Sequence, residues 1–147
     1  MTQIRSALNT EAASLAELID AAYQAYRDQG IALPDVSAGV DDAIAGGSVW
    51  VAETTTGDGA MVQGVLMVTL APPVAHLVNV AVAPDAAGQG VGGQLIRFAI
   101  ELAQRAGCDR IDLATHRDLS SNISLYQHLG WEVTERDGPR VRLSRTL

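Results

Sequence analysis

A glycine-rich loop carries the residue pattern with the most chemical content in this 147-residue chain. It follows a run of β-forming residues at 78–82 and a turn at Pro84, and it opens into an amphipathic segment that reaches about Arg105. The backbone N–H groups of such a loop and the partial positive charge at a helix start bind anions. Glycine keeps the backbone accessible, because a side chain would block a phosphate. The pattern therefore predicts a site for a phosphorylated cofactor.

Two other phosphate-binding patterns were compared with this loop. Gly88, Gly90 and Gly93 satisfy G-x-G-x-x-G, and Asp112 follows at about the 20-residue spacing of a dinucleotide site. However, Pro84-Asp85-Ala86-Ala87 lie between the strand and the loop, and fewer than 60 residues follow the loop, too few for the rest of a dinucleotide-binding sheet. The chain has no lysine, which excludes a Walker loop. A glycine-rich turn without a ligand remains an alternative.

Two segments resemble the GNAT family of acyl-CoA N-acyltransferases. The family motif Arg/Gln-x-x-Gly-x-Gly/Ala, between a strand ending in Val-x-Pro and a long helix, is similar to Ala87-Gly88-Gln89-Gly90-Val91-Gly92 after Val82-Ala83-Pro84. The family's Leu-Tyr-x-x-x-Gly-Phe segment is similar to Leu125-Tyr126-Gln127-His128-Leu129-Gly130-Trp131. Both motifs occur in the expected order, and the resemblance extends over the whole chain. The chain departs from the first motif at Ala87, where the family has Arg or Gln.

The resemblance implies an acetyl-CoA-dependent N-acetyltransferase without a metal. It would transfer the acetyl group to a primary amine of a small molecule or protein by direct attack in a ternary complex. The cofactor-binding residues implied are Val80, Val82, Ala87, Gly88, Gln89, Gly90, Val91, Gly92, Gly93 and Asn122. The loop would bind the pyrophosphate, mostly through backbone amides, so the loss of a side chain at position 87 weakens binding without abolishing it. The two valines would hydrogen-bond the pantetheine arm where their strand splays from its parallel neighbour.

Acetyl transfer needs a neutral amine and a protonated leaving group. A free alkylamine has a pKa of about 10.4 and a thiol about 8.5, so a base and an acid both help. Tyr126 is the candidate acid, because it occupies the family's Tyr position; the alternative is packing on the apolar face of its helix. His76 is the candidate base, six residues before Val82, and the equal alternative is a histidine that faces solvent. Asn79, polar within an apolar strand, either lines the acceptor pocket or bonds a neighbouring strand.

A catalytically silent acyl-CoA-binding module is the alternative function. It would account for Ala87 and for the absence of an obvious carboxylate base. The acceptor amine is expected to contact the first two helices and their connection, around Tyr23, Tyr26 and residues 31–36. The sequence does not identify this acceptor.

Composition indicates one globular domain over residues 1–147, with 48% hydrophobic and 18% charged residues. No apolar run approaches the roughly 18 residues of a membrane span, and no signal-peptide core is visible, which indicates a soluble cytoplasmic protein. The single cysteine, Cys108, suits a reducing compartment. The net charge of −7 disfavours nucleic acid. We expect an amine substrate as partner, no membrane, and either a monomer or a homodimer.

Periodicity and turn residues predict an α/β fold. We expect strands at 4–7, 48–53, 61–70, 76–82, 110–115, 131–135 and 140–143. We expect helices at 11–27, at 36–45, from the glycine loop to about 105, and at 119–129, ended by Gly30, Gly46-Gly47, Gly107 and Gly130. The apolar run at 76–82 suggests a strand buried on both faces. The family resemblance implies a mixed, mostly antiparallel sheet with a parallel, splayed pair of the fourth and fifth strands and about four flanking helices.

Overall fold

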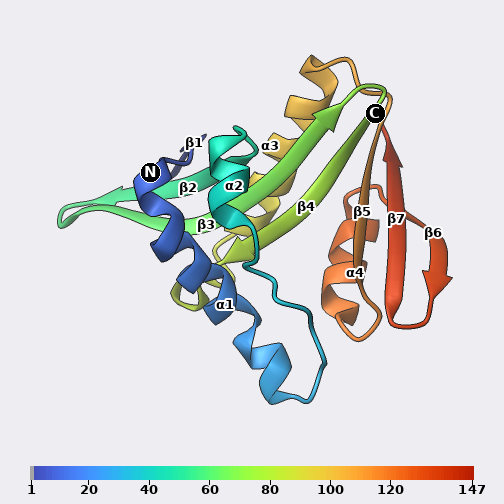
Figure 1. The fold of residues 1–147 in the computed structure, drawn as a ribbon, viewed down its shortest axis with the longest axis horizontal. Helices are drawn as coiled ribbons and strands as arrows, with labels where there is room; N and C mark the ends of the chain where they lie inside the picture. Colours follow the sequence, from blue (N-terminus) through green and yellow to red (C-terminus); the bar gives the residue numbers. More distant parts are fainter. Residues whose placement is uncertain (1) are drawn as a thin grey trace. The chain divides into compact units, whose positions relative to one another are not determined.

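The computed structural model describes residues 2–147, whose elements are shown in Figure 1. The strands are β1 (Thr2–Ser6), β2 (Val49–Thr56), β3 (Gly59–Ala71), β4 (Val74–Val82), β5 (Arg110–His116), β6 (Glu132–Asp137) and β7 (Arg140–Thr146). The helices are the short 3-10 helices η1 (Asn9–Glu11) and η2 (Pro84–Ala86) and the α-helices α1 (Ala12–Asp28), α2 (Val40–Ala45), α3 (Val91–Arg105) and α4 (Ser120–His128).

The strand order of the sheet is β1-β2-β3-β4-β5-β7-β6. β4 and β5 run parallel, whereas β1–β2, β2–β3, β5–β7 and β6–β7 pair antiparallel. The paired residues of β4 and β5 end at His76 and Asp112, although β4 continues to Val82. The predicted fold class, with its parallel and splayed pair, is therefore confirmed.

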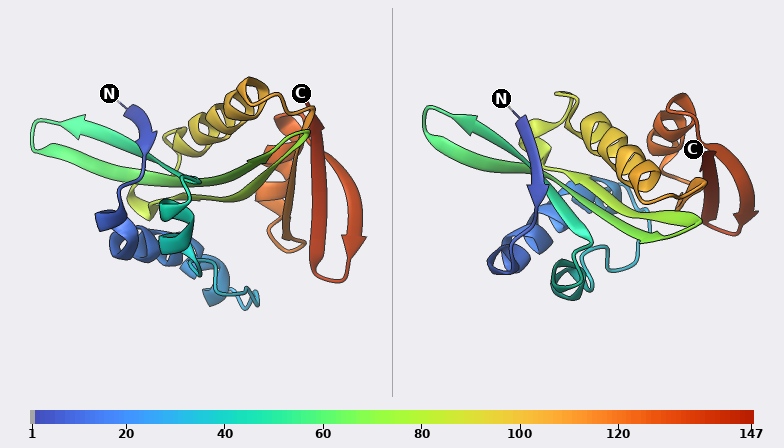
Figure 2. Two further views of the ribbon diagram at one scale, coloured as in Figure 1. Left: turned by 45° about the horizontal axis from the view of Figure 1, so that its top comes forward. Right: turned by 90° about the horizontal axis from the view of Figure 1, so that it is seen from above.

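The chain forms two compact units, each made of two segments. The first contains the residues up to Val68 together with Asn79–Ala99, and the second contains Thr69–Val78 together with Ile100–Leu147. In the first unit, α1 and α2 cover one face of β2 and β3, and the start of α3 lies on the other face (Figure 2). The core between them contains Leu15, Ile19, Val40, Ile44, Val49, Val51, Val65 and Met67.

Gly64 sets the distance between β3 and the first turns of α3. A Cβ atom at Gly64 would lie 2.8 Å from Leu95 Cδ1 and 2.9 Å from Val91 Cγ1, closer than side chains pack. A larger residue at this position would therefore force the side chains of Leu95 and Val91, or the helix that carries them, to move. Because Val91 is the first residue of α3, the contact fixes where the glycine loop enters the helix.

In the second unit, the indole of Trp131 fills the space between α4 and the sheet. The side chain is almost fully buried, and its Nε1–H donates to the carbonyl of Ile111 on β5 at 3.1 Å. Ile111, Leu113 and Leu143 are also buried here. This hydrogen bond satisfies the polar end of an otherwise apolar group, as burial of a tryptophan requires.

All four α-helices of the described chain end in the same way, at the glycines that the sequence indicated. In α4, the Trp131 N–H donates to the Tyr126 carbonyl at 3.0 Å, and the Gly130 N–H donates to the Gln127 carbonyl at 3.1 Å. This pair of bonds is the Schellman motif, which needs a left-handed residue. Gly130 supplies it with a φ of 104°. The corresponding glycines of α1, α2 and α3 are Gly30, Gly47 and Gly107.

Two local predictions were wrong. The second helix begins at Val40 rather than residue 36, because the Asp35 carboxylate accepts hydrogen bonds from the Ser37 N–H and hydroxyl and holds a turn there. β4 is not buried on both faces, since His76 is exposed and Val78 is 56% exposed, while Leu77 between them is buried. An apolar residue type does not by itself require burial.

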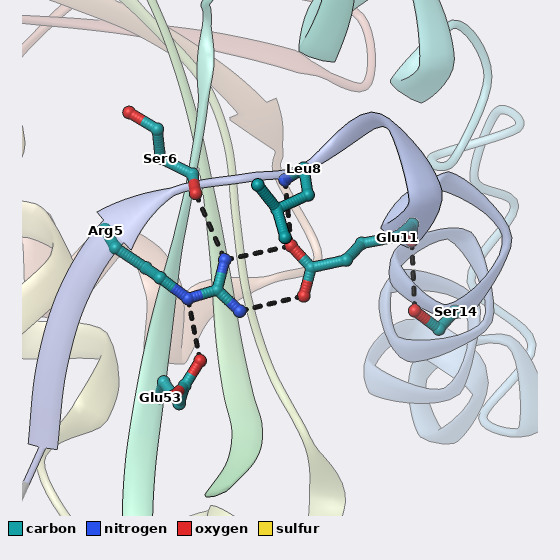
Figure 3. A network of polar contacts seen from close by, with 6 residues as sticks. All are labelled: Arg5, Ser6, Leu8, Glu11, Ser14 and Glu53. Atoms are coloured by element: carbon teal, nitrogen blue, oxygen red, sulfur yellow. Dashed lines mark hydrogen bonds and ion pairs between the residues drawn. The ribbon is translucent and has the colours of Figure 1, made fainter.

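Arg5 joins β1 to β2 and to η1 (Figure 3). Its guanidinium donates two hydrogen bonds of 2.9 Å to the Glu11 carboxylate and one of 2.7 Å to Glu53. The Leu8 N–H also donates to Glu11, at 2.8 Å. These donors, Arg5 above all, hold the pKa of Glu11 below its usual value. The network therefore fixes the entry to α1.

We expect Glu11→Gln to lower the melting temperature at pH 7 by roughly 3–6 °C, because it removes about 1–2 kcal/mol of charge-assisted hydrogen bonding. Since the folded-state pKa of Glu11 is lowered, its contribution is present above the unfolded pKa of about 4.3 and is lost as pH falls through the folded value. Melting curves at pH 7 and pH 3 should show the deficit shrink. Glu101→Gln, at an exposed pair 4.0 Å from Arg105, is the control and should change little. A deficit of equal size at both pH values would contradict this account.

Candidate functional site

The glycine loop presents a row of backbone amides without acceptors. It runs from η2 through Gly88 and Gly90, with φ values of 80° and 81°, into α3. Within residues 2–147, the N–H groups of Gly88, Gly90 and residues 91–93 donate to no protein acceptor, while the Gln94 N–H begins the helical pattern by bonding the Gly90 carbonyl at 3.1 Å. Unpaired amides at a helix start attract anions. The loop therefore has the donors that a phosphate needs.

The protein's own packing does not explain every glycine in this loop. Gly88 and Gly90 need their positive φ values, but φ at Gly92 is not positive. A Cβ atom at Gly92 would meet only Val82 Cγ2, at an ordinary 3.5 Å. Neither backbone conformation nor packing thus demands glycine at position 92. Glycine at this position leaves the space beside Val82 open.

Arg97 is the charged residue of the site that sequence reasoning missed. Its guanidinium folds back over Gly93, where an added Cβ would lie 3.6 Å from the Arg97 Nη1 atom. Within residues 2–147 Arg97 forms no ion pair, and its side chain is exposed. The spacing of four residues, which places side chains on one helix face, was the signal available in the sequence. Arg97 thus places a positive charge beside the loop whose position 87 is alanine.

The part of β4 nearest the loop is held by α1 and by the segment that follows it. The Tyr23 hydroxyl lies 3.1 Å from Asn79 Oδ1 and 3.3 Å from the carbonyl oxygen of Val80. The Asn79 amide donates to the Val36 carbonyl at 3.0 Å. Burial raises the pKa of Tyr23 to about 12, so the hydroxyl remains protonated at neutral pH. The Asn79 side chain therefore has hydrogen-bond partners for both its oxygen and its nitrogen, and the Val80 carbonyl oxygen accepts a hydrogen bond from the Tyr23 hydroxyl.

His76 lies at the rim of a pocket in the second unit. The pocket has a volume of about 390 Å³ and is lined by residues of β4, β5, β6 and β7, among them His76, Val78, Asp112, Arg140 and Arg142. Asp112 is the register partner of His76, but its carboxylate accepts from the Ser144 hydroxyl at 2.6 Å and from Arg110 at 3.2 Å. His76 is thus exposed, and the carboxylate of Asp112 next to it already accepts hydrogen bonds from Ser144 and Arg110.

Tyr126 lies on α4 next to the buried indole. The two rings contact edge to face, with centroids 5.6 Å apart, and the tyrosine is half-buried. Arg145 of β7 closes the end of the helix: its Nε–H donates to the Leu129 carbonyl at 3.0 Å, and its guanidinium lies 5.9 Å from the Trp131 ring centre. The second sequence motif is therefore also a helix-ending motif, and the Tyr126 ring packs on the Trp131 indole that follows it.

The remaining predicted site residues lie on α4, at the end of η2 and on β4. Asn122 is in the first turn of α4, half-buried, and its N–H donates to the Leu119 carbonyl at 3.0 Å. Ala87 is exposed and ends η2. The loop residues, Val80 and Val82 belong to the first unit, whereas His76, Asn122 and Tyr126 belong to the second. No helix in the described part of the chain is long and apolar enough to cross a membrane.

Known proteins are similar to this chain in sequence and in fold. The model of the acetyltransferase (GNAT) family matches residues 20–131. The uncharacterized N-acetyltransferase YvbK of Bacillus subtilis is 35% identical over 66 residues, which are 45% of this chain and 43% of that protein. The chain therefore matches less than half the length of that curated relative.

Solved structures agree over the whole chain. The PaiA N-acetyltransferase of Thermoplasma acidophilum, in complex with coenzyme A, has a TM-score of 0.82 and 16% identity, with 100% of this chain and 99% of that chain covered. The N-acetylglutamate synthase of Neisseria gonorrhoeae, complexed with coenzyme A and N-acetyl-glutamate, has a TM-score of 0.76 and 20% identity, with 100% of this chain and 35% of that chain covered. These likenesses establish the fold, and the family match covers most of the sequence. The chain belongs to the GNAT family of acetyltransferases.

Proposed function

We propose that this protein transfers an acetyl group from acetyl-CoA to a primary amine of a small molecule or peptide. The row of unpaired amides at Gly88, Gly90 and residues 91–93 carries the proposal, because it fits a pyrophosphate and lies in the family motif. The coenzyme A bound to the Thermoplasma relative supports the same co-substrate. Ala87 contributes its backbone only, and Arg97 supplies positive charge in place of the missing side chain.

Each remaining residue has a role set by its chemistry. Acetyl-CoA supplies an activated acyl group as a thioester. Val80, Val82 and Asn122 bind the pantetheine and acyl end. Tyr126 donates a proton to the departing thiolate, and His76 accepts the proton of the amine, directly or through water. Positioning of donor and acceptor supplies much of the remaining rate enhancement, and amines attack directly in a ternary complex.

The acceptor is proposed only as a class. The N-acetyl-glutamate held by the Neisseria relative makes amino acids one candidate group, beside polyamines and peptide N-termini. The net charge of −7 favours a cationic amine over nucleic acid. The free and buried Cys108 suits the reducing conditions of the cytoplasm, where we place the reaction.

Release of free thiol from acetyl-CoA across a panel of amino acids, polyamines and peptides tests the function. The chain has no lysine, so any N-acetyl-lysine detected belongs to a substrate. Thermal shifts with acetyl-CoA, coenzyme A, NAD and ATP accompany the panel, and a ligand at 100 times its Kd stabilises by about 2.7 kcal/mol. Stabilisation by coenzyme A without thiol release on any amine indicates the silent binding module. Stabilisation by NAD or ATP alone would overturn both readings.

We expect Arg97→Gln to weaken coenzyme A binding by about 10-fold, because a charge-assisted hydrogen bond to phosphate contributes about 1.5–3 kcal/mol. Calorimetry with coenzyme A and with dephospho-coenzyme A separates the phosphates: an equal loss on both assigns Arg97 to the pyrophosphate. Arg105→Gln, at the other end of α3, is the matched control and should bind as the wild type does. Equal affinity of the two variants would remove Arg97 from the site.

A further inference from the structure

The amide of Asn79 connects three segments of the first unit. It accepts from the Tyr23 hydroxyl of α1 at 3.1 Å and donates to the Val36 carbonyl at 3.0 Å. Val36 belongs to the connection between α1 and α2, residues 29–39. The three residues are far apart in sequence, with Asn79 56 positions from Tyr23 and 43 from Val36. The side chain therefore joins β4 to α1 and to the connection that follows it.

The carboxamide of Asn79 performs both functions with one side chain. Its oxygen accepts from a hydroxyl while its nitrogen donates to a carbonyl. Aspartate would place an oxygen against the Val36 carbonyl, and an apolar residue of the kind found elsewhere in β4 would leave the partly buried groups of Tyr23 and Val36 without this partner. The one polar side chain between Leu77 and Val82 thus has a specific geometric task.

The connection held by Asn79 has few other hydrogen bonds, and its main apolar contact is the packing of Val36 against the core of the first unit. Its backbone bonds are the ends of α1 and a turn in which the Ala38 N–H donates to the Asp35 carbonyl at 3.3 Å. Arg27 adds one bond of 2.9 Å to the Pro34 carbonyl. Without the Asn79 bond, the segment would keep these few hydrogen bonds and the packing of Val36, and exposed hydrogen bonds of this kind open readily in solution.

Next to Asn79, the Tyr23 hydroxyl also reaches the carbonyl of Val80, at 3.3 Å. Val80 is one of the residues proposed to hold the cofactor. The same hydroxyl therefore contacts the cofactor strand and the side chain that holds the connection.

We propose that Asn79 is a positioning residue that holds the α1–α2 connection against the cofactor strand, so that the connection forms an ordered wall of the acceptor-amine site. The inference rests on the proposed function, since it assigns the acceptor side of that same site. Asn79 acts through Val36 and Tyr23 and takes no part in proton transfer. Its effect belongs to binding of the amine, not to binding of coenzyme A.

Two variants separate the halves of the network. Asn79→Asp keeps the acceptor for Tyr23 and removes the donor to Val36, whereas Tyr23→Phe removes the hydroxyl and keeps the ring. Hydrogen exchange of the unliganded proteins should show amides in residues 31–38 exchanging about 10-fold faster in Asn79→Asp than in the wild type. In the double variant that combines Asn79→Asp with Tyr23→Phe, the loss of exchange protection should not exceed the sum of the losses in the two single variants. The reason is that the two hydrogen bonds share the Asn79 side chain.

Kinetics distinguishes positioning from a structural role. With the panel amine of highest kcat/KM, Asn79→Asp should raise the KM for the amine about 10-fold, while the KM for acetyl-CoA and the Kd for coenzyme A stay within about two-fold. Thr54→Val, which removes a 2.8 Å hydrogen bond to Gln63 within the same unit, is the control for hydrogen-bond loss and should leave both KM values unchanged. Only an increase confined to the KM for the amine in Asn79→Asp supports the proposal.

Failure of the positioning role of Asn79 and failure of the proposed acetyltransferase function give different results. Equal increases in both KM values, or an unchanged KM for the amine, overturn the positioning role while leaving the proposed function intact. A wild-type protein without turnover on any amine contradicts the proposed function. In that case hydrogen exchange still decides whether Asn79 holds the connection, and wild-type exchange rates in Asn79→Asp would refute it.

Discussion

Tyr126→Phe should lower kcat by about 100-fold or more and leave coenzyme A affinity unchanged. The phenol is proposed to protonate the thiolate, and loss of a general acid costs roughly this factor. The phenylalanine ring retains the contact to Trp131 at 5.6 Å, and the backbone bond from the Trp131 N–H does not involve the side chain. The fold should therefore survive, with a melting temperature within about 4 °C of the wild type.

Measurement of kcat and melting temperature on one preparation decides the role of Tyr126. Trp131→Phe is the informative comparison, because it removes the hydrogen bond to the Ile111 carbonyl and some buried volume but leaves the Tyr126 hydroxyl in place. It should lower the melting temperature strongly, because it lowers the free energy of unfolding by about 1–3 kcal/mol or more. If Tyr126→Phe instead behaves as Trp131→Phe does, with reduced stability and wild-type turnover per folded molecule, the tyrosine belongs to packing alone.

Gly92→Val should weaken coenzyme A binding by about 100-fold while the protein remains folded. A Cβ there meets only Val82 at 3.5 Å, so the protein accommodates the side chain. The methyl groups would instead occupy the space over the free amides, at a cost comparable to one or two charge-assisted hydrogen bonds of about 1.5–3 kcal/mol each. Gly92→Ala should bind with intermediate affinity and melt slightly higher, since alanine favours a helix over glycine by about 0.5–1 kcal/mol.

Titration calorimetry with coenzyme A checks this prediction, with Gly57→Val as the matched control. Gly57 lies outside the loop, has no positive φ, and has nothing within 4 Å of an added Cβ. The control should bind coenzyme A as the wild type does. Wild-type affinity in a folded Gly92→Val protein would show that the phosphates lie elsewhere.

The sequence predicted those features that depend on local backbone chemistry. Each α-helix ends at an indicated glycine, because a left-handed residue is needed there and glycine adopts it without strain. The parallel pair of β4 and β5 and the hairpins also agree with the prediction. The start of the second helix did not, since the side chain of Asp35 competes for the backbone in a way that periodicity does not report.

Features that depend on contacts between distant segments were beyond the sequence. Asn79 was recognised as a polar residue in need of partners, but nothing in the pattern identified Tyr23, 56 positions away, or Val36. Arg97 was read only as part of a helix, although its guanidinium lies on Gly93. Periodicity reports which face a side chain occupies and not where a long, flexible side chain ends.

The hydrogen bond from Arg145 to the carbonyl at the end of α4 has a consequence for protein synthesis. A nine-residue helix is marginal by itself in water, and Leu129, the residue after α4, is translated 16 residues before the arginine that bonds its carbonyl. The helix that carries Tyr126 is thus completed only when β7 has been translated. A nonsense codon at position 145 would yield a chain with its glycine loop intact but without the bond from Arg145 to the end of α4, and we expect this product to keep affinity for coenzyme A and to lose turnover.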